Sequence, residues 1–190
     1  MQKPSDRKLE IVTVSAQLFK EKGYSAVTMR DIAQAMDIKA ASLYNHIRSK
    51  QEILVLMIIA IAEEYTANIR TIAASEATSV EKIENVIQLH IDITVNNPDA
   101  LASLNNDWMH LPAAELQYFL QMREEYEDIF RAIVKQGITD GEIRNYNAEV
   151  IIFSILSTIR TLYLWYGKKK DFSPNILKTN LKKVLLEGII

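Results

Sequence analysis

Side chains that can donate hydrogen bonds to phosphate oxygens are concentrated between Thr28 and Lys50. One short helix is expected over residues 28–36 and a second over 40–47. The residues expected to point outward around the second helix are Lys39, Ala40, Ser42, Tyr44, Asn45 and His46. Small residues at its beginning would let the helix enter a major groove, and the hydroxyl and imidazole groups suit hydrogen bonds to phosphates. The chemistry indicated is non-covalent binding to a nucleic acid.

Two short helices joined by a turn near Asp37 and Ile38 form the pattern of a helix-turn-helix. Thr28 is expected to cap the first helix, and the carboxylate of Asp31 adds favourable charge in its first turn. The residues expected to pack the motif together are apolar, and they are Met29, Ile32, Ala33, Met36, Ile38, Leu43 and Ile47.

Residues 8–56 resemble the N-terminal part of the tetracycline-repressor (TetR) family in order and spacing. The matching positions are Leu18, Phe19, Gly23, Tyr24, Thr28, Ile32, Ala33, Leu43, Tyr44, His46, Ile47, Lys50 and Ile53. Three positions depart from the pattern. The family's turn glycine is Asp37, its small hydroxyl residue after the turn is Lys39, and its closing phenylalanine is Ile47. Aspartate tolerates a left-handed backbone at some cost, and a lysine can itself hydrogen-bond guanine.

The resemblance implies a role for each polar residue of the motif. Those implied to contact phosphates are Thr28, Tyr44, His46 and Lys50. Arg30 is implied to reach a phosphate or a base edge. Those implied to face the bases are Lys39, Ala40, Ala41 and Ser42.

Each of these residues also has an ordinary structural alternative. Tyr44 could pack between helices, and His46 could hydrogen-bond at a helix end. Lys50 could be a solvated surface cation, and Arg30 could pair at the surface with a neighbouring acid, which would contribute little stability.

Composition excludes several classes of protein. The chain of 190 residues has no cysteine, which excludes a disulfide framework, a thiolate metal site and a cysteine nucleophile, and favours the cytoplasm. Its N-terminus lacks the apolar core of a signal peptide. The longest uncharged apolar stretches, 53–62 and 150–159, reach about half the length of a bilayer span, so we expect no membrane partner.

The charge is unevenly distributed along the chain. Residues 1–50 carry a formal charge of +4, and the remainder carries −6. A basic head on an acidic body suits a polyanionic partner at one end, although ordinary variation in surface charge is the alternative.

Only 5 glycines and 4 prolines are present, which favours long helices with short connections. Helical periodicity predicts helices over 5–22, 28–36, 40–47, 53–74, 79–96, 98–110, 112–136, 147–166 and 173–187. The expected fold is all-α, with about nine helices. An N-terminal three-helix, helix-turn-helix DNA-binding domain (1–48) would precede a C-terminal helical ligand-binding and dimerisation domain (49–190).

The middle helices carry aromatic and methionine residues with a few polar groups, a composition that fits a small lipophilic effector. The resemblance implies a mostly apolar cavity here. The candidate effector-binding residues are His90, Trp108, Met109, Tyr118, Met122, Tyr126 and Phe153. An ordinary hydrophobic core is the alternative. A metal site on His90 and His110 with Asp92 or Asp107 lacks tight ligand spacing, so no metal is expected.

The helix expected over 147–166 is apolar nearly all round and needs cover on several sides. The resemblance implies that the last two helices pair with those of a second copy as a four-helix bundle. The candidate interface residues are Ile155, Ile159, Leu162, Leu181, Val184 and Leu185. The alternative is a single monomeric core.

These features together predict a cytoplasmic, homodimeric transcription regulator that binds a palindromic double-stranded DNA operator. It would be a repressor released by a small effector of unknown identity, with no other cofactor. The alternative is a DNA-binding protein whose body binds a protein partner or no ligand. A helical enzyme is not expected, because the sequence shows no Ser-His-Asp order, no phosphate-binding glycine loop and no acidic metal motif.

Overall fold

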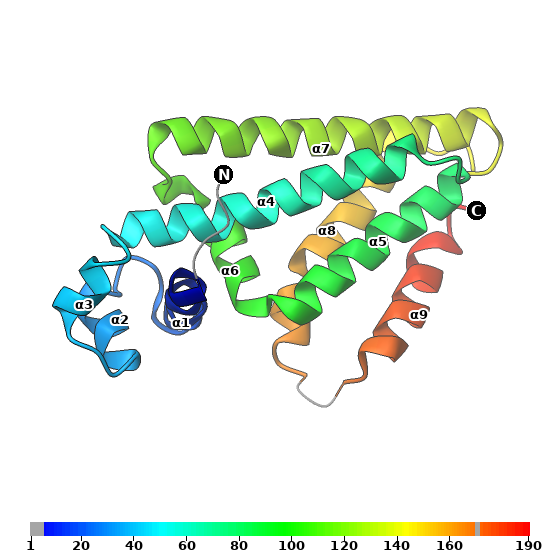
Figure 1. The fold of residues 1–190 in the computed structure, drawn as a ribbon. Helices are drawn as coiled ribbons and strands as arrows, with labels where there is room; N and C mark the ends of the chain where they lie inside the picture. The colour runs from blue at the N-terminus through cyan, green and yellow to red at the C-terminus, as the bar shows by residue number, and fades with distance from the viewer. Residues whose placement is uncertain (1–5, 170–171) are drawn as a thin grey trace. The chain divides into compact units, whose positions relative to one another are not determined.

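The computed structural model describes residues 6–169 and 172–190, and the regular structure within these ranges is entirely helical. The helices are α1 (Asp6–Lys22), α2 (Met29–Ala35), α3 (Ala40–Tyr44), α4 (Lys50–Ala74), α5 (Ser79–Asn96), α6 (Pro98–Asn106), the short 3-10 helix η1 (Trp108–His110), α7 (Ala113–Thr139), α8 (Ala148–Tyr166) and α9 (Pro174–Leu186) (Figure 1). The all-α prediction is confirmed. Ser5, the expected cap of the first helix, lies outside the described residues.

The described residues divide into two compact units, which we call unit 1 and unit 2. Unit 1 lies within Met1–Ile61 and Asp99–Phe119, and unit 2 consists of Ala62–Pro98 with described residues of Leu120–Ile190. Both α4 and α7 therefore contribute to each unit. Unit 1 contains more than the predicted head, because α6 and η1 pack with it although they follow α5 in the sequence. The predicted boundary after residue 48 stays a prediction.

Two helix boundaries near the turn differ from those that the periodicity predicts. The third helix ends at Tyr44 rather than at residue 47, and α4 begins at Lys50 rather than at residue 53. The reason for the second difference is a cap, because Ser49 Oγ accepts a hydrogen bond of 3.1 Å from the amide of Glu52. The Glu52 carboxylate accepts in turn from the amide of Arg48 at 2.7 Å. The capping signal therefore decides the start of α4, three residues before its apolar face begins.

Gly137 lies inside α7, whereas the sequence predicted that it ends the helix. A Cβ built on Gly137 would lie 2.6 Å from Ile143 Cδ1 and 2.7 Å from Ser79 Cβ. The missing side chain thus permits close approach between α7, the start of α5 and the loop before α8. The helix continues through Gly137 because this packing outweighs the low helix propensity of glycine.

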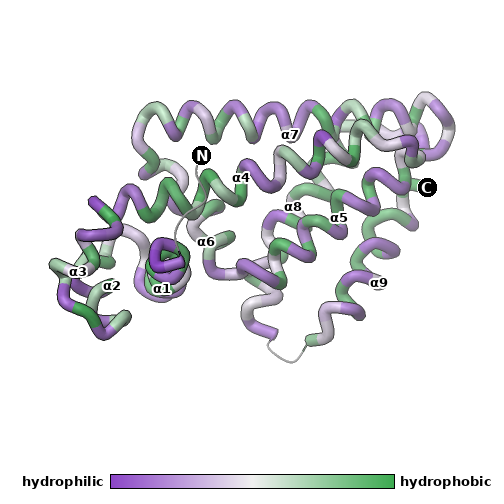
Figure 2. Tube along the Cα trace, viewed as in Figure 1, coloured by the Kyte–Doolittle hydropathy of each residue, from purple (hydrophilic) through white to green (hydrophobic). Residues whose placement is uncertain are grey.

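The core of unit 2 is built around α5, which contacts both α8 and α9 (Figure 1). Hydrophobic residues alternate with hydrophilic ones along α5 and α9, as in helices that bury one face (Figure 2). The α5 helix starts with a capping box, in which Thr78 and Glu81 bond each other's backbone amides. Its buried stripe contains Ile83, Ile87 and Ile91, all of which are fully buried.

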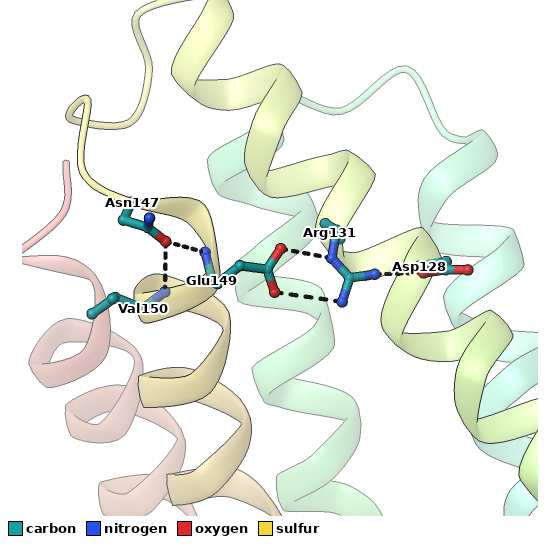
Figure 3. A network of polar contacts seen from close by, with 5 residues as sticks. All are labelled: Asp128, Arg131, Asn147, Glu149 and Val150. Atoms are coloured by element: carbon teal, nitrogen blue, oxygen red, sulfur yellow. Dashed lines mark hydrogen bonds and ion pairs between the residues drawn. The ribbon is translucent and has the colours of Figure 1, made fainter.

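The beginning of α8 is held by polar contacts to its own backbone and to α7 (Figure 3). The side-chain oxygen of Asn147 accepts from the amides of Glu149 at 2.9 Å and Val150 at 3.4 Å. The Glu149 carboxylate accepts from Arg131 of α7 at 2.8 Å, and Arg131 also pairs with Asp128. These contacts fix the rotation of α8, and so decide which of its apolar residues enter the core of unit 2.

Among the described residues, α8 alone has the length and composition of a membrane-crossing helix. Seven of its residues are buried within the chain, including Ile155, Ile159 and Leu162. Burial on this scale accounts for its apolar character as a core helix of unit 2.

Replacement of Gly137 by alanine is expected to lower the free energy of unfolding by about 1–3 kcal/mol, because the new Cβ must displace Ile143 and Ser79. Urea denaturation followed by circular dichroism measures this. Gly188→Ala is the matched control, since a Cβ at Gly188 meets nothing within 4 Å. Equal stability of the Gly137 variant and the wild type would contradict the close approach.

Candidate nucleic-acid interface

The helix-turn-helix is formed by α2, the turn at Asp37 and α3, all within unit 1. Four of the residues predicted to pack inward are buried, since Ile32, Leu43 and Ile47 are 0% exposed and Ala33 is 2% exposed, whereas Met29, Met36 and Ile38 are half-buried. Of the residues predicted to point outward, Lys39, Ser42, Tyr44, Asn45 and His46 are exposed, and the other candidate DNA contacts Thr28, Arg30 and Ala41 are exposed as well. Ala40 is half-buried. Tyr44 is 53% exposed, so it is not packed between helices.

The turn between α2 and α3 is closed by backbone hydrogen bonds. The amide of Ile38 donates to the carbonyl of Ala33 at 3.0 Å, and the amide of Asp37 donates to that of Gln34 at 3.1 Å. This pair of bonds defines a Schellman motif, which requires a left-handed residue at its centre. Asp37 occupies that position with φ of 52°. An aspartate here costs roughly 1 kcal/mol of backbone strain relative to glycine.

The hydroxyl of Thr28 serves the structure of α2 itself. Its Oγ1 accepts from the amide of Asp31 at 3.2 Å and donates to Asp31 Oδ2 at 2.6 Å. The Asp31 carboxylate accepts from the Thr28 amide at 2.7 Å. These hydrogen bonds from Thr28 lower the pKa of Asp31 below its ordinary value. Thr28 therefore caps the helix as expected, and its role as a phosphate contact stays a prediction.

Lys50 is bound to backbone oxygens of unit 1 rather than solvated. Its Nζ donates to the carbonyls of Tyr24 at 2.6 Å, Val27 at 2.8 Å and Ser25 at 3.4 Å. It also lies 4.3 Å from the centroid of the Tyr24 ring, a cation–π contact. Partial desolvation lowers the pKa of Lys50. Lys50 thus ties the loop between α1 and α2 to the start of α4, and the implied phosphate contact would have to compete with three carbonyls.

The segment formed by α6 and η1 packs against the same loop of unit 1. The ring of His110 stacks on Tyr24 with centroids 5.0 Å apart. Its carbonyl accepts from Gln51 Nε2 at 3.0 Å. At the other end, Lys20 of α1 pairs with Asp99 at 2.6 Å. The α6–η1 segment therefore braces the helix-turn-helix from outside the motif, which no local sequence pattern indicated.

The seven candidate effector residues fall in different places. Trp108, Met109 and Tyr118 belong to unit 1, where Met109 is 57% exposed and Tyr118 is 44% exposed. In unit 2, Phe153 is 72% exposed on α8, so its side chain lines no interior space of a single chain. The remaining three, His90, Met122 and Tyr126, lie in the interior of unit 2.

A buried polar cluster joins two of these residues to one that the sequence did not single out. His90 Nε2 lies 2.8 Å from the hydroxyl of Tyr126, and the His90 ring packs on Tyr65 with centroids 4.5 Å apart. Burial lowers the pKa of His90 to about 3, so its imidazole is neutral at physiological pH. Burial also raises the pKa of both tyrosines. Tyr65 follows Ile58 by seven residues and precedes Ile69 by four, so its helical spacing could have revealed it.

The residues of the alternative metal site are divided between the two units. His90 and Asp92 belong to unit 2, whereas Asp107 and His110 belong to unit 1, and Asp92 pairs with Lys178 at 2.6 Å. Within 6–169 and 172–190, no three histidine, aspartate or glutamate side chains are grouped so as to hold a metal ion.

The predicted dimer residues also differ in position. Ile155, Ile159 and Leu162 are at most 6% exposed and form part of the core of unit 2, so they do not face a second copy in this conformation. Leu181 and Leu185 are half-buried, and Val184 is 74% exposed. The polar residues Ser154, Ser157, Thr158 and Thr161 recur at helical spacing on the exposed face of α8, so periodicity could have indicated that its opposite face is the buried one.

Comparison with known proteins decides the family. The sequence profile described as "Tetracyclin repressor-like, C-terminal domain" matches residues 76–189, and that described as "Bacterial regulatory proteins, tetR family" matches residues 11–57. The chain belongs to the TetR family. The predicted resemblance is confirmed, and with it the prediction of a DNA-binding transcription regulator.

Relatives match this TetR-family chain over almost its whole length. The HTH-type transcriptional repressor KstR2 of Rhodococcus jostii is 25% identical over 187 residues, which are 97% of this chain and 92% of the relative. The structure of the ketosteroid transcriptional regulator KstR2 of Mycobacterium tuberculosis has a TM-score of 0.91 at 21% identity, covering 98% of this chain and 96% of the other. AibR, solved in complex with isovaleryl coenzyme A and operator DNA, has a TM-score of 0.79 at 19% identity, covering 94% and 97%. The two KstR2 proteins are named as a transcriptional repressor and a transcriptional regulator.

Lys50→Met is expected to lower the free energy of unfolding by about 1–3 kcal/mol, because it leaves carbonyls of the α1–α2 loop without a donor. DNA affinity should fall with it, but the slope of log Kd against log salt concentration should stay unchanged. Thermal denaturation and binding titrations at several salt concentrations measure both effects.

Lys39→Met is the control for stability, since Lys39 has no partner among the described side chains and its loss should not move the melting temperature. A slope for Lys50→Met that is shallower by about 0.9 would mean that Lys50 itself contacts a phosphate.

Proposed function

We propose that this chain is a homodimeric repressor that binds a palindromic operator through α2 and α3 and is released from it by a small lipophilic effector. The observation that carries the proposal is the exposure of Ser42 and Tyr44 beside the buried Leu43 and Ile47, in a chain of the TetR family. A recognition helix so anchored presents small side chains and hydroxyl groups to a groove. The predicted site residues remain the candidates for contact with DNA.

The proposal of a dimer is supported by the outward face of α8. Large apolar side chains are exposed at both of its ends, with Val150 at 61% and Phe153 at 72% near the beginning and Leu164 at 52% and Trp165 at 44% near the end. Val184 of α9 adds a further exposed side chain. An apolar surface of this extent on a folded chain favours association.

The middle of this face carries hydroxyl groups that are already satisfied. Ser154 Oγ donates to the carbonyl of Val150 at 2.8 Å, and Thr158 Oγ1 donates to that of Ser154 at 3.0 Å. Thr161 Oγ1 donates to the carbonyl of Ser157 at 2.8 Å. Covering these small side chains therefore leaves no donor without an acceptor, and their size permits another helix to come close.

Phe153→Glu is expected to convert the dimer to a monomer, because a carboxylate would enter an apolar interface. Operator affinity should fall by about 100-fold or more, because binding of one helix-turn-helix no longer raises the effective concentration of a second one at the other half of the operator. Light scattering after size-exclusion chromatography gives the mass, and fluorescence anisotropy gives the affinity. Leu120→Glu, on an apolar residue of α7 that is 42% exposed, is the matched control and should stay dimeric. A dimeric Phe153 variant would contradict this interface.

We propose an acyl thioester as the effector class to test first, because AibR was solved with isovaleryl coenzyme A. The interior of unit 2 offers apolar residues with the neutral His90 and the hydroxyl of Tyr126. Charged effector groups would have to stay outside this interior, whereas an acyl chain and its carbonyl suit it.

Titration of the operator complex with acyl-coenzyme A compounds of increasing chain length is expected to release the DNA, whereas coenzyme A alone should not. Fluorescence anisotropy of a labelled duplex measures release. The duplex is one selected by the wild-type chain from a random pool. If neither acyl thioesters nor free fatty acids release the DNA, a body that binds a protein partner or no ligand is favoured instead.

A further inference from the structure

An open groove of about 540 Å³ lies along the outward side of the helix-turn-helix. It is lined by Arg30, Ala33, Gln34, Asp37, Ile38, Lys39 and Ala40. The long polar side chains come from α2 and from the turn, whereas α3 contributes only Ala40. Hydrogen bonding in this groove is therefore supplied largely from outside the recognition helix.

The two cations of the groove are available for a ligand. Arg30 and Lys39 are exposed and form no hydrogen bond or ion pair with the part of the chain that the structure describes. Arginine and lysine bind both phosphate oxygens and the O6 and N7 acceptors of guanine. Nothing in the two cations themselves makes them choose a base over a phosphate.

Asp37 places a negative charge among these cations. Asp37 lines the same groove, and its carboxylate has no hydrogen-bond partner in residues 6–169 and 172–190. It also occupies the left-handed position of the turn, at φ of 52°, where glycine would carry neither strain nor charge. The chain thus keeps a strained, charged residue inside the surface that is to meet a polyanion.

We propose that Asp37 determines sequence discrimination by excluding phosphate oxygens from the groove, which leaves Arg30 and Lys39 to bond guanine edges. The inference rests on the proposed entry of α2 and α3 into a major groove. A phosphate carries a full negative charge, whereas guanine acceptors carry partial charges, so the carboxylate repels the phosphate more strongly. Non-specific binding consists mainly of phosphate contacts, and it is therefore weakened more than operator binding.

The test compares two DNA probes. One is the duplex that the wild-type chain selects from a random library, and the other is a pool of random duplexes of equal length. For Asp37→Asn, which keeps the left-handed preference and removes the charge, affinity for the random pool should rise about fivefold and affinity for the selected duplex by less than about twofold. The salt dependence of random-pool binding should steepen by about one unit of log–log slope, as one phosphate contact is gained.

Two further variants separate charge from conformation. Asp37→Gly should show the same loss of discrimination with a higher melting temperature, because glycine relieves the strain at this φ. Glu21→Gln makes the same change in net charge on α1, away from the groove, and should preserve the ratio of the two affinities.

Several results would overturn the proposal. An equal fold gain for both probes would reduce the role of Asp37 to a general charge effect, and unchanged affinities for both probes would show that it has no role in recognition. A loss of selected-duplex affinity, recovered when one base pair is changed, would show that Asp37 reads cytosine directly. Unchanged binding by the double variant Arg30→Ala with Lys39→Ala would likewise overturn the inferred guanine contacts, whereas the proposed function fails separately if the wild-type chain selects no sequence.

Discussion

The position of the helix-turn-helix depends on one half-buried cation, Lys50. Lys50 Nζ satisfies carbonyls of Tyr24, Ser25 and Val27, which follow the end of α1 and precede the Thr28 cap of α2. These carbonyls belong to a loop with no regular structure of its own, so few backbone partners are available to them. A lysine at the first position of α4 therefore joins three helices of unit 1 through one ammonium group. Lys50, which the family resemblance implies to be a phosphate contact, thus bonds the protein's own backbone.

The charges of the interface are used in contrasting ways. Some charged groups are already bonded within the fold, since the carboxylate of Asp31 caps α2 and that of Glu52 caps α4. Others, Arg30 and Lys39, are left exposed without a partner in the described chain. The formal charge of +4 in residues 1–50 therefore overstates how many cations can meet a polyanion directly. In unit 2, the hydroxyl of Ser154 on the exposed face of α8 bonds its own helix, and His90 and Tyr126 bond each other.

Much of the helical order could be predicted from sequence, because amphipathic spacing and caps are local. Asn147, Ser49 and Thr28 each begin or cap the helix that their residue types indicate. What the sequence could not decide depends on distant partners. Glycine is typical of a helix end, yet Gly137 lies inside α7, where the absence of a side chain lets Ile143 and Ser79 come close. Likewise Ile155 and Phe153 are both apolar residues of α8, and the packing of α8 against α5 decides which one is buried.

The membership of unit 1 limits how this protein can be rearranged. Residues Asp99–Phe119 belong to that unit, where His110 covers the Tyr24 ring and Asp99 holds Lys20. A fragment cut after Ile61, where the N-terminal part of unit 1 ends, would expose the ring of Tyr24 and leave Gln51 without its acceptor. Replacing the DNA-binding unit of this regulator with that of another protein thus requires the exchange of two separate stretches of the gene. A recombinant that exchanges only the N-terminal stretch would pair it with a 99–119 segment from a different protein, against which it did not evolve to pack.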